Sequence, residues 1–362
     1  MDTKRKKLYI ILAVINGAAI ILAAVLLAVF TSVTGRLSSQ QAAKRWSKER
    51  YSQLSVFYDN SAGMNIDGIY TMRVEIEKKL TENSISQENP MWRLWFDAYS
   101  AQSALTVQSP RTDYNVSADA IVTATGGDYF LFHPLKLLSG AYYAPDELMQ
   151  DRVIIDYNLA WQLFGSKDAD GMTVLINGTR YYVAGVVEPD QDKASEYVYG
   201  TKPHIYMSYD ALKRIYSGAD VPITTYEVCL PDPVTGLAAK IVGDVNTVDD
   251  TLCEIVENSA RYDILRLYKI AFDGGKRAVV DRSIVYPFWE NAARMTEENA
   301  AALLVWLSAA VLVPILTALY FIGMLIHRRK RIWAFIKDKL TGLFGKLSII
   351  RRKPKTRKEQ EL

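Results

Sequence analysis

Two long stretches without a charged residue constrain this chain more than any other feature of its sequence. Residues 8–35 and 300–326 contain no Asp, Glu, Lys or Arg. The first stretch is apolar as far as Phe30, apart from Asn16 and Gly17. A bilayer core of about 30 Å takes roughly 20 helical residues at about 1.5 Å each, so both stretches are long enough to span a membrane.

Each stretch has an alternative reading. The first resembles a signal peptide in position, but the apolar run of a signal peptide is usually about 7–15 residues. The run here is longer, and residues 30–35 make a poor small-residue cleavage site. The second stretch has the length of a buried soluble helix only if that helix is unusually long, and residues 328–331 (Arg-Arg-Lys-Arg) follow it at once. We therefore expect an uncleaved anchor and a second span.

Basic residues beside the two stretches predict their orientation. Lys and Arg next to a span stay in the cytoplasm. Residues 4–7 (Lys-Arg-Lys-Lys) precede the first stretch, and residues 328–331 follow the second. The net charge of the whole chain is only +3 because acidic residues are concentrated between the stretches. We expect a protein of the cell membrane with both termini in the cytoplasm and a large extracytoplasmic domain.

The predicted organisation has five segments. They are a basic cytoplasmic N-terminus (1–7), a first transmembrane helix (8–33), an extracytoplasmic domain (34–299), a second transmembrane helix (300–326) and a basic cytoplasmic tail (327–362).

The region between the spans mixes helical and strand patterns, which predicts an α+β domain with its own core. The expected helices are a stalk at 36–58, then 66–80, 157–164, 234–245 and 249–267. The expected strands are 92–107, 119–125, 152–156, 172–176, 181–187, 203–208 and 224–230, and residues 189–200 are expected to form a polar loop.

Cysteine and histidine are scarce. Cys229 and Cys253 are the only cysteines, so one disulfide or two buried free thiols are both open. His133, His204 and His327 lie too far apart in sequence to predict a zinc site, and His133 before Pro134 is expected on a surface turn.

A series of short motifs carries a family resemblance. Tyr129-Phe130 is followed by Gly140, by a strand and helix ending in Leu163-Phe164-Gly165, and by Gly171. Asn177-Gly178 then joins two strand-like runs, the strongest short signal for a hairpin, and Val183, Gly185 and Val186 lie in the second run. In order and spacing this series resembles the extracytoplasmic core domain of MacB-type ABC transporter permeases, the MacB/FtsX-like class.

The same motif positions also have structural roles of their own. Gly165 is expected to end a helix in left-handed geometry. Asn177-Gly178 is expected to form the turn, and Val183, Gly185 and Val187 are expected to share one strand face. None of these positions offers catalytic chemistry.

The resemblance implies a domain of two subdomains that passes conformational change between membrane helices and outside partners. It also implies an ABC ATPase subunit or a fuller permease as partner. The sequence departs from the pattern because one span follows the domain where a MacB-type permease has three. No Walker A motif is present, since Gly342 to Lys346 has the wrong spacing.

Catalysis is not predicted. Asp249-Asp250 and Glu188 near Asp190 are expected on solvated faces or loops, although a pair of carboxylates could in principle serve a glycosidase. Serine and cysteine lack a recognisable nucleophile elbow. We expect no enzyme activity, no metal and no cofactor.

The cytoplasmic tail has the pattern of an amphipathic basic helix. Its apolar and basic residues are expected on different sides, which suits the anionic inner surface of the membrane. The residues expected at that surface are Trp333, Phe335, Lys337, Lys339, Phe344 and Lys346. A solvated stop-transfer tail and a docking surface for an ATPase are alternatives, and no nucleic-acid partner is expected.

Three functions follow. The favoured one is a non-catalytic permease-like subunit or accessory of an ABC system, which transmits conformational change. The second is a membrane-anchored sensor, scaffold or binding protein without transport. The third is an extracytoplasmic enzyme. Homo- and hetero-oligomers both remain open.

Overall fold

The computed structural model describes residues 3–86, 92–110, 116–145, 147–219, 221–279 and 283–350. Side chains at 3–5, 328 and 330–350 lie outside this description. The chain divides into two compact units, Val29–Leu304 and the pair of segments Met1–Ala28 and Val305–Leu362. Each unit is described by itself.

The larger unit is built on one ten-stranded sheet with the order β10-β1-β9-β2-β3-β8-β5-β7-β4, in which β6 also pairs with β2 and β7. The strands are β1 (Tyr51–Tyr58), β2 (Phe96–Gln108), β3 (Ser117–Gly127), β4 (Lys136–Gly140), β5 (Arg152–Asp156), β6 (Thr173–Ile176), β7 (Thr179–Glu188), β8 (His204–Ser208), β9 (Thr225–Pro231) and β10 (Cys253–Glu257). Most neighbours are antiparallel, but β3–β8 and β5–β7 are parallel. This mixture confirms the predicted α+β class.

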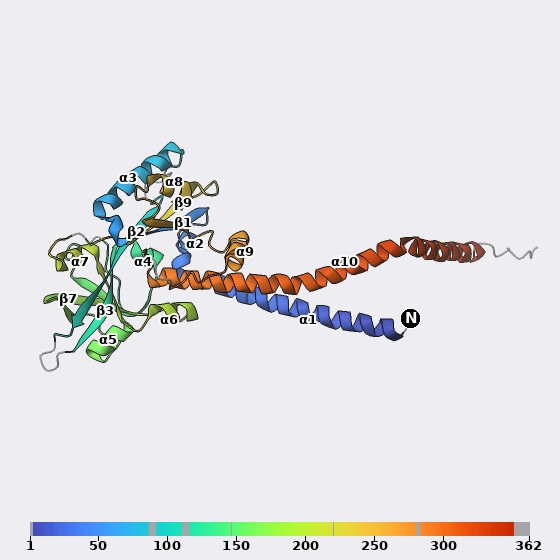
Figure 1. The fold of residues 1–362 in the computed structure, drawn as a ribbon, viewed down its shortest axis with the longest axis horizontal. Helices are drawn as coiled ribbons and strands as arrows, with labels where there is room; N and C mark the ends of the chain where they lie inside the picture. The colour runs from blue at the N-terminus through green and yellow to red at the C-terminus, as the bar shows by residue number, and fades with distance from the viewer. Residues whose placement is uncertain are drawn as a thin grey trace, which may run out of the picture. The chain divides into compact units, whose positions relative to one another are not determined.

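The two expected subdomains share this sheet. Helix α3 (Ile66–Glu82) packs against α8 (Leu237–Val245), and α8 packs against β1. Helices α5 (Tyr157–Phe164) and α7 (Tyr209–Ile215) both pack against β3 and β8. Figure 1 shows the two helix pairs at opposite ends of the sheet. The long β2–β3 hairpin links the two ends, so no break in hydrogen bonding separates them.

Both faces of the sheet are covered. On β5, Val153 and Ile155 belong to the large core under α3, α5, α7 and α8, while Ile154 between them belongs to a second core. This alternation is the two-residue period of a strand. The second core contains residues of α2 (Ala42–Trp46), α4 (Tyr129–Phe132) and Trp289. A helical layer therefore lies on each face.

The stalk predicted for residues 36–58 is wrong. Only α2 and the short turn η1 (Ser38–Gln40) are helical, and the segment ends in β1, which lies between β9 and β10. Every residue from Ser52 to Tyr58 is buried. A strand buried on both faces loses the polar–apolar alternation that identifies a strand in sequence, so its apolar residues imitated a helical spacing.

Two further predictions of secondary structure are wrong. Residues 189–200 contain helix α6 (Lys193–Tyr199), whose N-cap Asp192 accepts hydrogen bonds from two backbone amides. Residues 249–267 form strand β10 and the beginning of α9 (Ile264–Asp273) instead of one helix. Strand β10 exists because it pairs with β1, a partner some 200 residues earlier in the chain, and short-range periodicity does not encode such pairing.

The motif segment folds as predicted in most respects. Strand β5 and helix α5 have the expected bounds, and Gly165 ends α5 at φ +67°. Asn177 and Gly178 have φ of 49° and 77° and connect β6 to β7. Positive φ at both central residues is what a tight hairpin turn requires.

The shared face expected for Val183, Gly185 and Val187 is wrong. The register between β5 and β7 skips Ala184, which marks a β-bulge. Val183 belongs to the large core, whereas Val187 belongs to the core on the other face. One extra residue in a strand exchanges the faces of all residues that follow it.

The smaller unit is a helix pair. Helices α1 (Thr3–Thr34) and α10 (Phe288–Ile350) contain the two stretches long and apolar enough to cross a membrane, Lys6–Thr34 and Phe288–His327. Only 6% of the most apolar part of each is buried, unlike the core helix of a soluble protein. Asn16 donates a hydrogen bond to Thr317 (3.2 Å), and the Tyr9 and Phe321 rings lie 5.8 Å apart. The residue number on α1 decreases from 16 to 9 while that of its contact on α10 increases from 317 to 321, so the helices are antiparallel.

Candidate functional site: a buried charge network at the start of α10

The first turns of α10 are enclosed by the large unit. Trp289, Ala292, Ala293 and Ala300 are buried, and so are the charged residues of this segment described next. Such burial needs partners, because an unpaired charge inside a protein costs several kcal/mol. The segment is the part of α10 that belongs to the domain.

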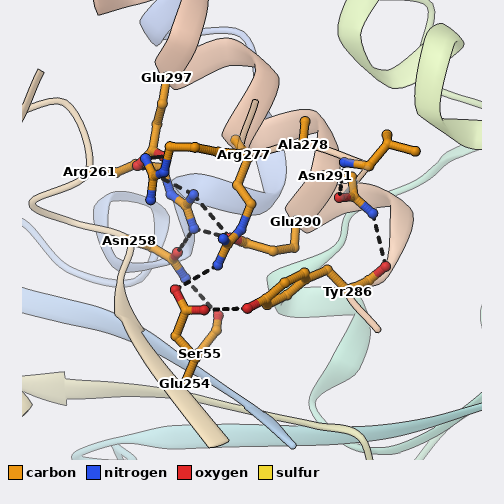
Figure 2. Close-up of polar contacts among 12 residues, drawn as sticks. Ser55, Glu254, Asn258, Arg261, Arg277, Ala278, Tyr286, Glu290, Asn291 and Glu297 are labelled. Atoms are coloured by element: carbon orange, nitrogen blue, oxygen red, sulfur yellow. Dashed lines mark hydrogen bonds and ion pairs between the residues drawn. The ribbon is translucent and has the colours of Figure 1, made fainter. Parts of the chain in front are cut away.

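Arg261 is the centre of these partners. Its guanidinium is fully buried and donates to Glu290 at 2.6 Å, with Glu297 at 3.5 Å. It also donates to the side-chain oxygen of Asn258 at 2.7 Å. Figure 2 shows Arg261 between the α10 carboxylates and the loop that follows β10. The planar guanidinium of an arginine can donate to two carboxylates at once, so it suits this buried site better than the ammonium group of a lysine would.

Arg294 forms the second bridge. It donates to Glu290, one helical turn before it, at 2.7 Å, and to Glu254 of β10 at 2.8 Å. Its guanidinium lies 3.9 Å from the centre of the Tyr286 ring, and the Tyr286 hydroxyl donates to Glu254. The sheet edge and the helix are thus joined by charge-assisted hydrogen bonds and a cation–π contact.

Glu297 extends the network to α9. This buried carboxylate lies 3.2 Å from Arg266 and 2.5 Å from Arg277. The backbone amide of Arg277 donates to the neighbouring Glu298. The carboxylates of α10 therefore hold the segment after α9 as well as the loop after β10.

Opposite charges keep the buried guanidinium of Arg261 ionised. Burial alone would lower the pKa of Arg261, but the nearby charges of Glu290 and Glu297 outweigh it and raise that pKa above its ordinary value. Arg261 therefore stays protonated at any physiological pH. We name Arg261, Arg294, Glu254, Glu290 and Glu297 the charge network.

A polar path continues from the charge network into the sheet. Asn258 donates to Ser55 of β1 at 2.7 Å, and Ser55 donates to Glu227 of β9 at 3.1 Å. Glu227 pairs with the Nε2 atom of His133. The expectation that His133 lies on a surface turn is wrong, since it is buried. Pro134 lies in the short link between α4 and β4, and a local signal of this kind contains no information on which distant residues cover His133.

Aromatic rings fix the same helix start from the other side. The Trp289 ring lies 4.6 Å from His133 and 5.9 Å from Tyr129, and Phe288 lies 5.2 Å from His204. Tyr129, a motif residue, thus contacts α10. It lies in α4 and not at the end of a strand.

One buried acid supports these rings. Asp156 caps α5 and accepts hydrogen bonds from the hydroxyl of Tyr199 and the backbone amide of His204. Burial raises the pKa of Asp156 to about 6, although hydrogen bonds from Leu159 and His204 oppose the rise. Burial lowers the pKa of His204 to about 4. Burial therefore shifts the two pKa values in opposite directions, upward for Asp156 and downward for His204.

The remaining motif residues serve the sheet and its turns. Leu163 and Val186 are buried in the large core, Phe164 packs against it, and Phe130 stacks on Tyr142 with centroids 4.5 Å apart. Gly171 turns the chain at φ +77°. The structure therefore spreads the motif over the fold and does not gather it into one site.

Gly140 and Gly185 mark a close approach of two strands. They are paired across β4 and β7. A methyl group on Gly140 would lie 2.1 Å from the carbonyl oxygen of Ala184, and one on Gly185 would lie 2.8 Å from that of Ala141. Only a residue without a side chain fits at either position.

The tail residues cannot be placed by their side chains. Helix α10 includes positions 327–350, but the side chains of Trp333, Phe335, Lys337, Lys339, Phe344 and Lys346 lie outside the described residues. Their role at the membrane surface stays a prediction.

Sequence reasoning missed the charge network. Glu290, Arg294 and Glu297 are spaced by four and three residues, which places them on one helix face. That spacing, directly before an apolar stretch, was the available signal. The partners Glu254 and Arg261 had no local signal, because only folding brings them to α10.

The arrangement joins helix α10 to its neighbours through buried ion pairs. Among the described residues, no group of three His, Cys, Asp or Glu side chains could hold a metal ion. Cys229 and Cys253 are free and buried, and burial raises the pKa of Cys229 to about 12, which suppresses the reactive thiolate. The network can bind α10 to the sheet and to α9.

Comparison with protein families gives one match over most of the chain. The family model for the MacB-like periplasmic core domain matches residues 11–242. The resemblance stated from the motifs is thereby confirmed. Strand β10, helix α9 and the α10 residues of the charge network lie beyond the matched residues.

A curated relative and two solved structures are similar. The macrolide export ATP-binding/permease protein MacB of Chromobacterium violaceum is 28% identical over 181 residues, which cover 46% of this chain and 27% of that protein. The extracellular domain of the noncanonic ABC-type transporter YknZ from Gram-positive bacteria is 14% identical, with a TM-score of 0.38, over 56% of this chain and 99% of that one. The periplasmic region of MacB from Actinobacillus actinomycetemcomitans is 17% identical, with a TM-score of 0.39, over 57% and 89%.

Proposed function

This chain belongs to the family of MacB-like periplasmic core domains, and from that premise we propose that it is a non-catalytic, permease-like membrane subunit or accessory protein. It transmits conformational change between its two membrane helices and its extracytoplasmic domain.

The observation that carries the proposal is the sharing of one helix by two environments. Helix α10 contains both the charge network and the apolar stretch 300–326. Arg261 and Arg294 bind it to the loop after β10 and to β10 itself. A displacement of the apolar part must either carry this sheet edge along or break buried ion pairs, and the second costs several kcal/mol.

The proposed topology places both termini in the cytoplasm, with residues 8–33 and 300–326 as spans and 34–299 outside. The antiparallel pairing of α1 and α10 at Asn16 and Thr317 supports it, because antiparallel spans bring their outer ends to the same side. The basic flanks at 4–7 and 328–331 support the direction.

The proposed partner is an ABC ATPase, alone or as part of a fuller permease. The name of the Chromobacterium relative joins ATP binding and permease in one protein, and the match to this chain covers 27% of that protein. Affinity purification of the full chain from gently solubilised membranes should recover such a partner. Repeated recovery of the chain by itself would contradict the proposal and favour the alternative, a membrane-anchored sensor, scaffold or binding protein without transport.

A second experiment tests transmission. In the purified complex, hydrogen exchange at backbone amides of β10 and of residues 288–297 should change when ATP or its non-hydrolysable analogue is added. The outer strand β4 serves as an internal control, since it lies at the other edge of the sheet. Exchange that responds to nucleotide at neither place would indicate a tether without transmission.

A further inference from the structure

Helix α9 carries two apolar faces, of which the domain covers only one. Leu267 is fully buried in a cluster with Ala300, Ala301 and Leu304 of α10. Phe30 of α1 packs against the same cluster. This face of α9 is accounted for by packing within the domain.

The second face of α9 is open. Ile264, Leu265 and Phe272 are 60%, 84% and 80% exposed. At about 100° per residue they fall within one sector of the helix, in which Leu265 and Phe272 lie opposite Leu267 and Ile264 lies between the two faces. Tyr268 stacks on Phe272 with centroids 6.3 Å apart. Large apolar side chains gathered in this way mark an interaction site more often than a bare surface.

Basic residues border the open face. Lys269 and Lys276 are exposed, and neither is within ion-pair distance of a carboxylate among the residues that the structure describes. With Arg266, Arg277 and Asp273 they line a groove of about 490 Å³ at the end of α9. The lining of this groove holds four basic residues and one carboxylate, so its charge is positive.

The contacts of α9 with the two apolar stretches indicate what covers its open face. Leu267 packs against residues 300–304, the first residues of the apolar stretch, and near Phe30, where the first apolar run ends. Both positions are where helices of a two-span protein leave the hydrocarbon. An apolar face flanked by lysines at that level fits the boundary between acyl chains and headgroups.

We propose that α9 lies on the outer leaflet of the bilayer, with Ile264, Leu265 and Phe272 among the upper acyl chains. Lys269 and Lys276 bind the phosphates of anionic phospholipids. The inference rests on the proposed two-span topology, but it concerns a contact that this topology alone does not require. It makes α9 a sensor of the membrane surface that is connected to the charge network through Arg266.

The test uses the full chain in phospholipid nanodiscs. Spin labels are attached to Leu265→Cys and Phe272→Cys, and to Val74→Cys as the matched control on α3, where Val74 is 66% exposed. Native Cys229 and Cys253 are buried, and the unsubstituted chain measures any background labelling. Labels at 265 and 272 should be relaxed more by oxygen than by a water-soluble nickel chelate, and the label at 74 should show the reverse.

Lipid composition tests the headgroup contact. Burial of one large apolar side chain changes partition by roughly tenfold or more, so Leu265→Ser should raise chelate access at a label on 272 severalfold. Replacing Lys269 and Lys276 by Gln should abolish any difference in chelate access at a label on 272 between nanodiscs with and without phosphatidylglycerol.

Two results would overturn the proposal. One is chelate access at 265 and 272 equal to that at 74, which would place α9 in water. The other is dipolar broadening between labels of two chains, which would make a second copy the occupant. Either result leaves the co-purification of an ATPase unaffected, so the two proposals fail independently.

Discussion

Helix α10 is one continuous helix, and its two parts combine burial and charge in opposite ways. Between 288 and 304 most side chains are buried or half-buried in the domain, and the four charged residues there have partners on other segments. From 305 to 326 most side chains are exposed, yet none is charged. The first part needs polar partners because protein surrounds it, and the second has the apolar surface that a lipid environment would require.

The comparison shows that exposure alone does not identify the surroundings of a helix. Leu316 is 55% exposed in an apolar stretch, whereas Glu290 is buried in a segment rich in charge. A soluble protein would reverse both. The sequence pattern and the burial pattern must therefore be read together.

The largest expected effect breaks the buried part. Glu290→Gln removes the charge shared by Arg261 and Arg294, and loss of one member of a buried ion pair costs about 3–5 kcal/mol. Chemical unfolding of the full chain in detergent measures it. Glu75→Gln is the control, because its pair with Lys78 is exposed and should cost less than about 1 kcal/mol. Equal effects would show that the charge network contributes no more than a surface pair.

A charge placed in the apolar part should act on insertion and not on folding of the domain. Leu316→Lys is expected to disfavour the second span by about 2.5–3.5 kcal/mol, the cost of a charge at the centre of a membrane helix. Carbonate extraction measures the fraction that remains integrated, with Leu316→Ala as control. Full retention of the lysine variant would contradict the assignment of 300–326 as a span.

The same substitution in both parts sharpens the contrast. Ala293 is fully buried in the domain, so Ala293→Leu should overpack it and cost about 1–3 kcal/mol. Ala309 is exposed in the apolar part, so Ala309→Leu should leave unfolding unchanged within about 0.5 kcal/mol. Melting temperatures of the two variants, compared under one condition, decide the matter. A larger shift for position 309 would reverse the proposed environments.

The smallest expected effect concerns pH and the groups beneath Phe288. The folded pKa of Asp156 is raised to about 6, so its contribution to stability is present below pH 4 and is lost as pH rises through 6. The folded pKa of His204 is lowered to about 4, so its contribution is present above pH 6.5 and is lost as pH falls toward 4. In the wild type the two slopes oppose each other.

Single variants should separate these slopes. Relative to wild type, Asp156→Asn should gain stability as pH rises between about 4 and 6, and His204→Gln should lose stability as pH rises between about 4 and 6.5. Each slope is at most about 1.4 kcal/mol per pH unit, the value for one proton. Unfolding midpoints in a pH series provide the readout. Parallel profiles for the two variants would show that neither group titrates as described.

The membrane helices and the motif segment were predictable because their signals are local. A charge-free run identifies a span without knowledge of any contact. Asn177-Gly178 and Gly165 require particular backbone angles that few residues adopt, so the residue types themselves predict the turn and the helix end. The family resemblance rests on the same kind of position.

The errors fall where a distant partner decides the local structure. Strand β10 forms by pairing with β1, and β1 is buried between two strands, so neither has the alternation of an exposed strand. The bulge at Ala184 reverses which face Val187 occupies, and the cover over His133 comes from Trp289, far along the chain.

The sequence by itself determined which two stretches are long and apolar enough to cross a membrane and which family the chain belongs to, because hydropathy and turn geometry are properties of short segments. Only the tertiary structure decided that Arg261, Glu254 and the α10 carboxylates meet. Buried charges are stable only where folding brings opposite charges within hydrogen-bonding distance, and that distance is a property of the whole fold.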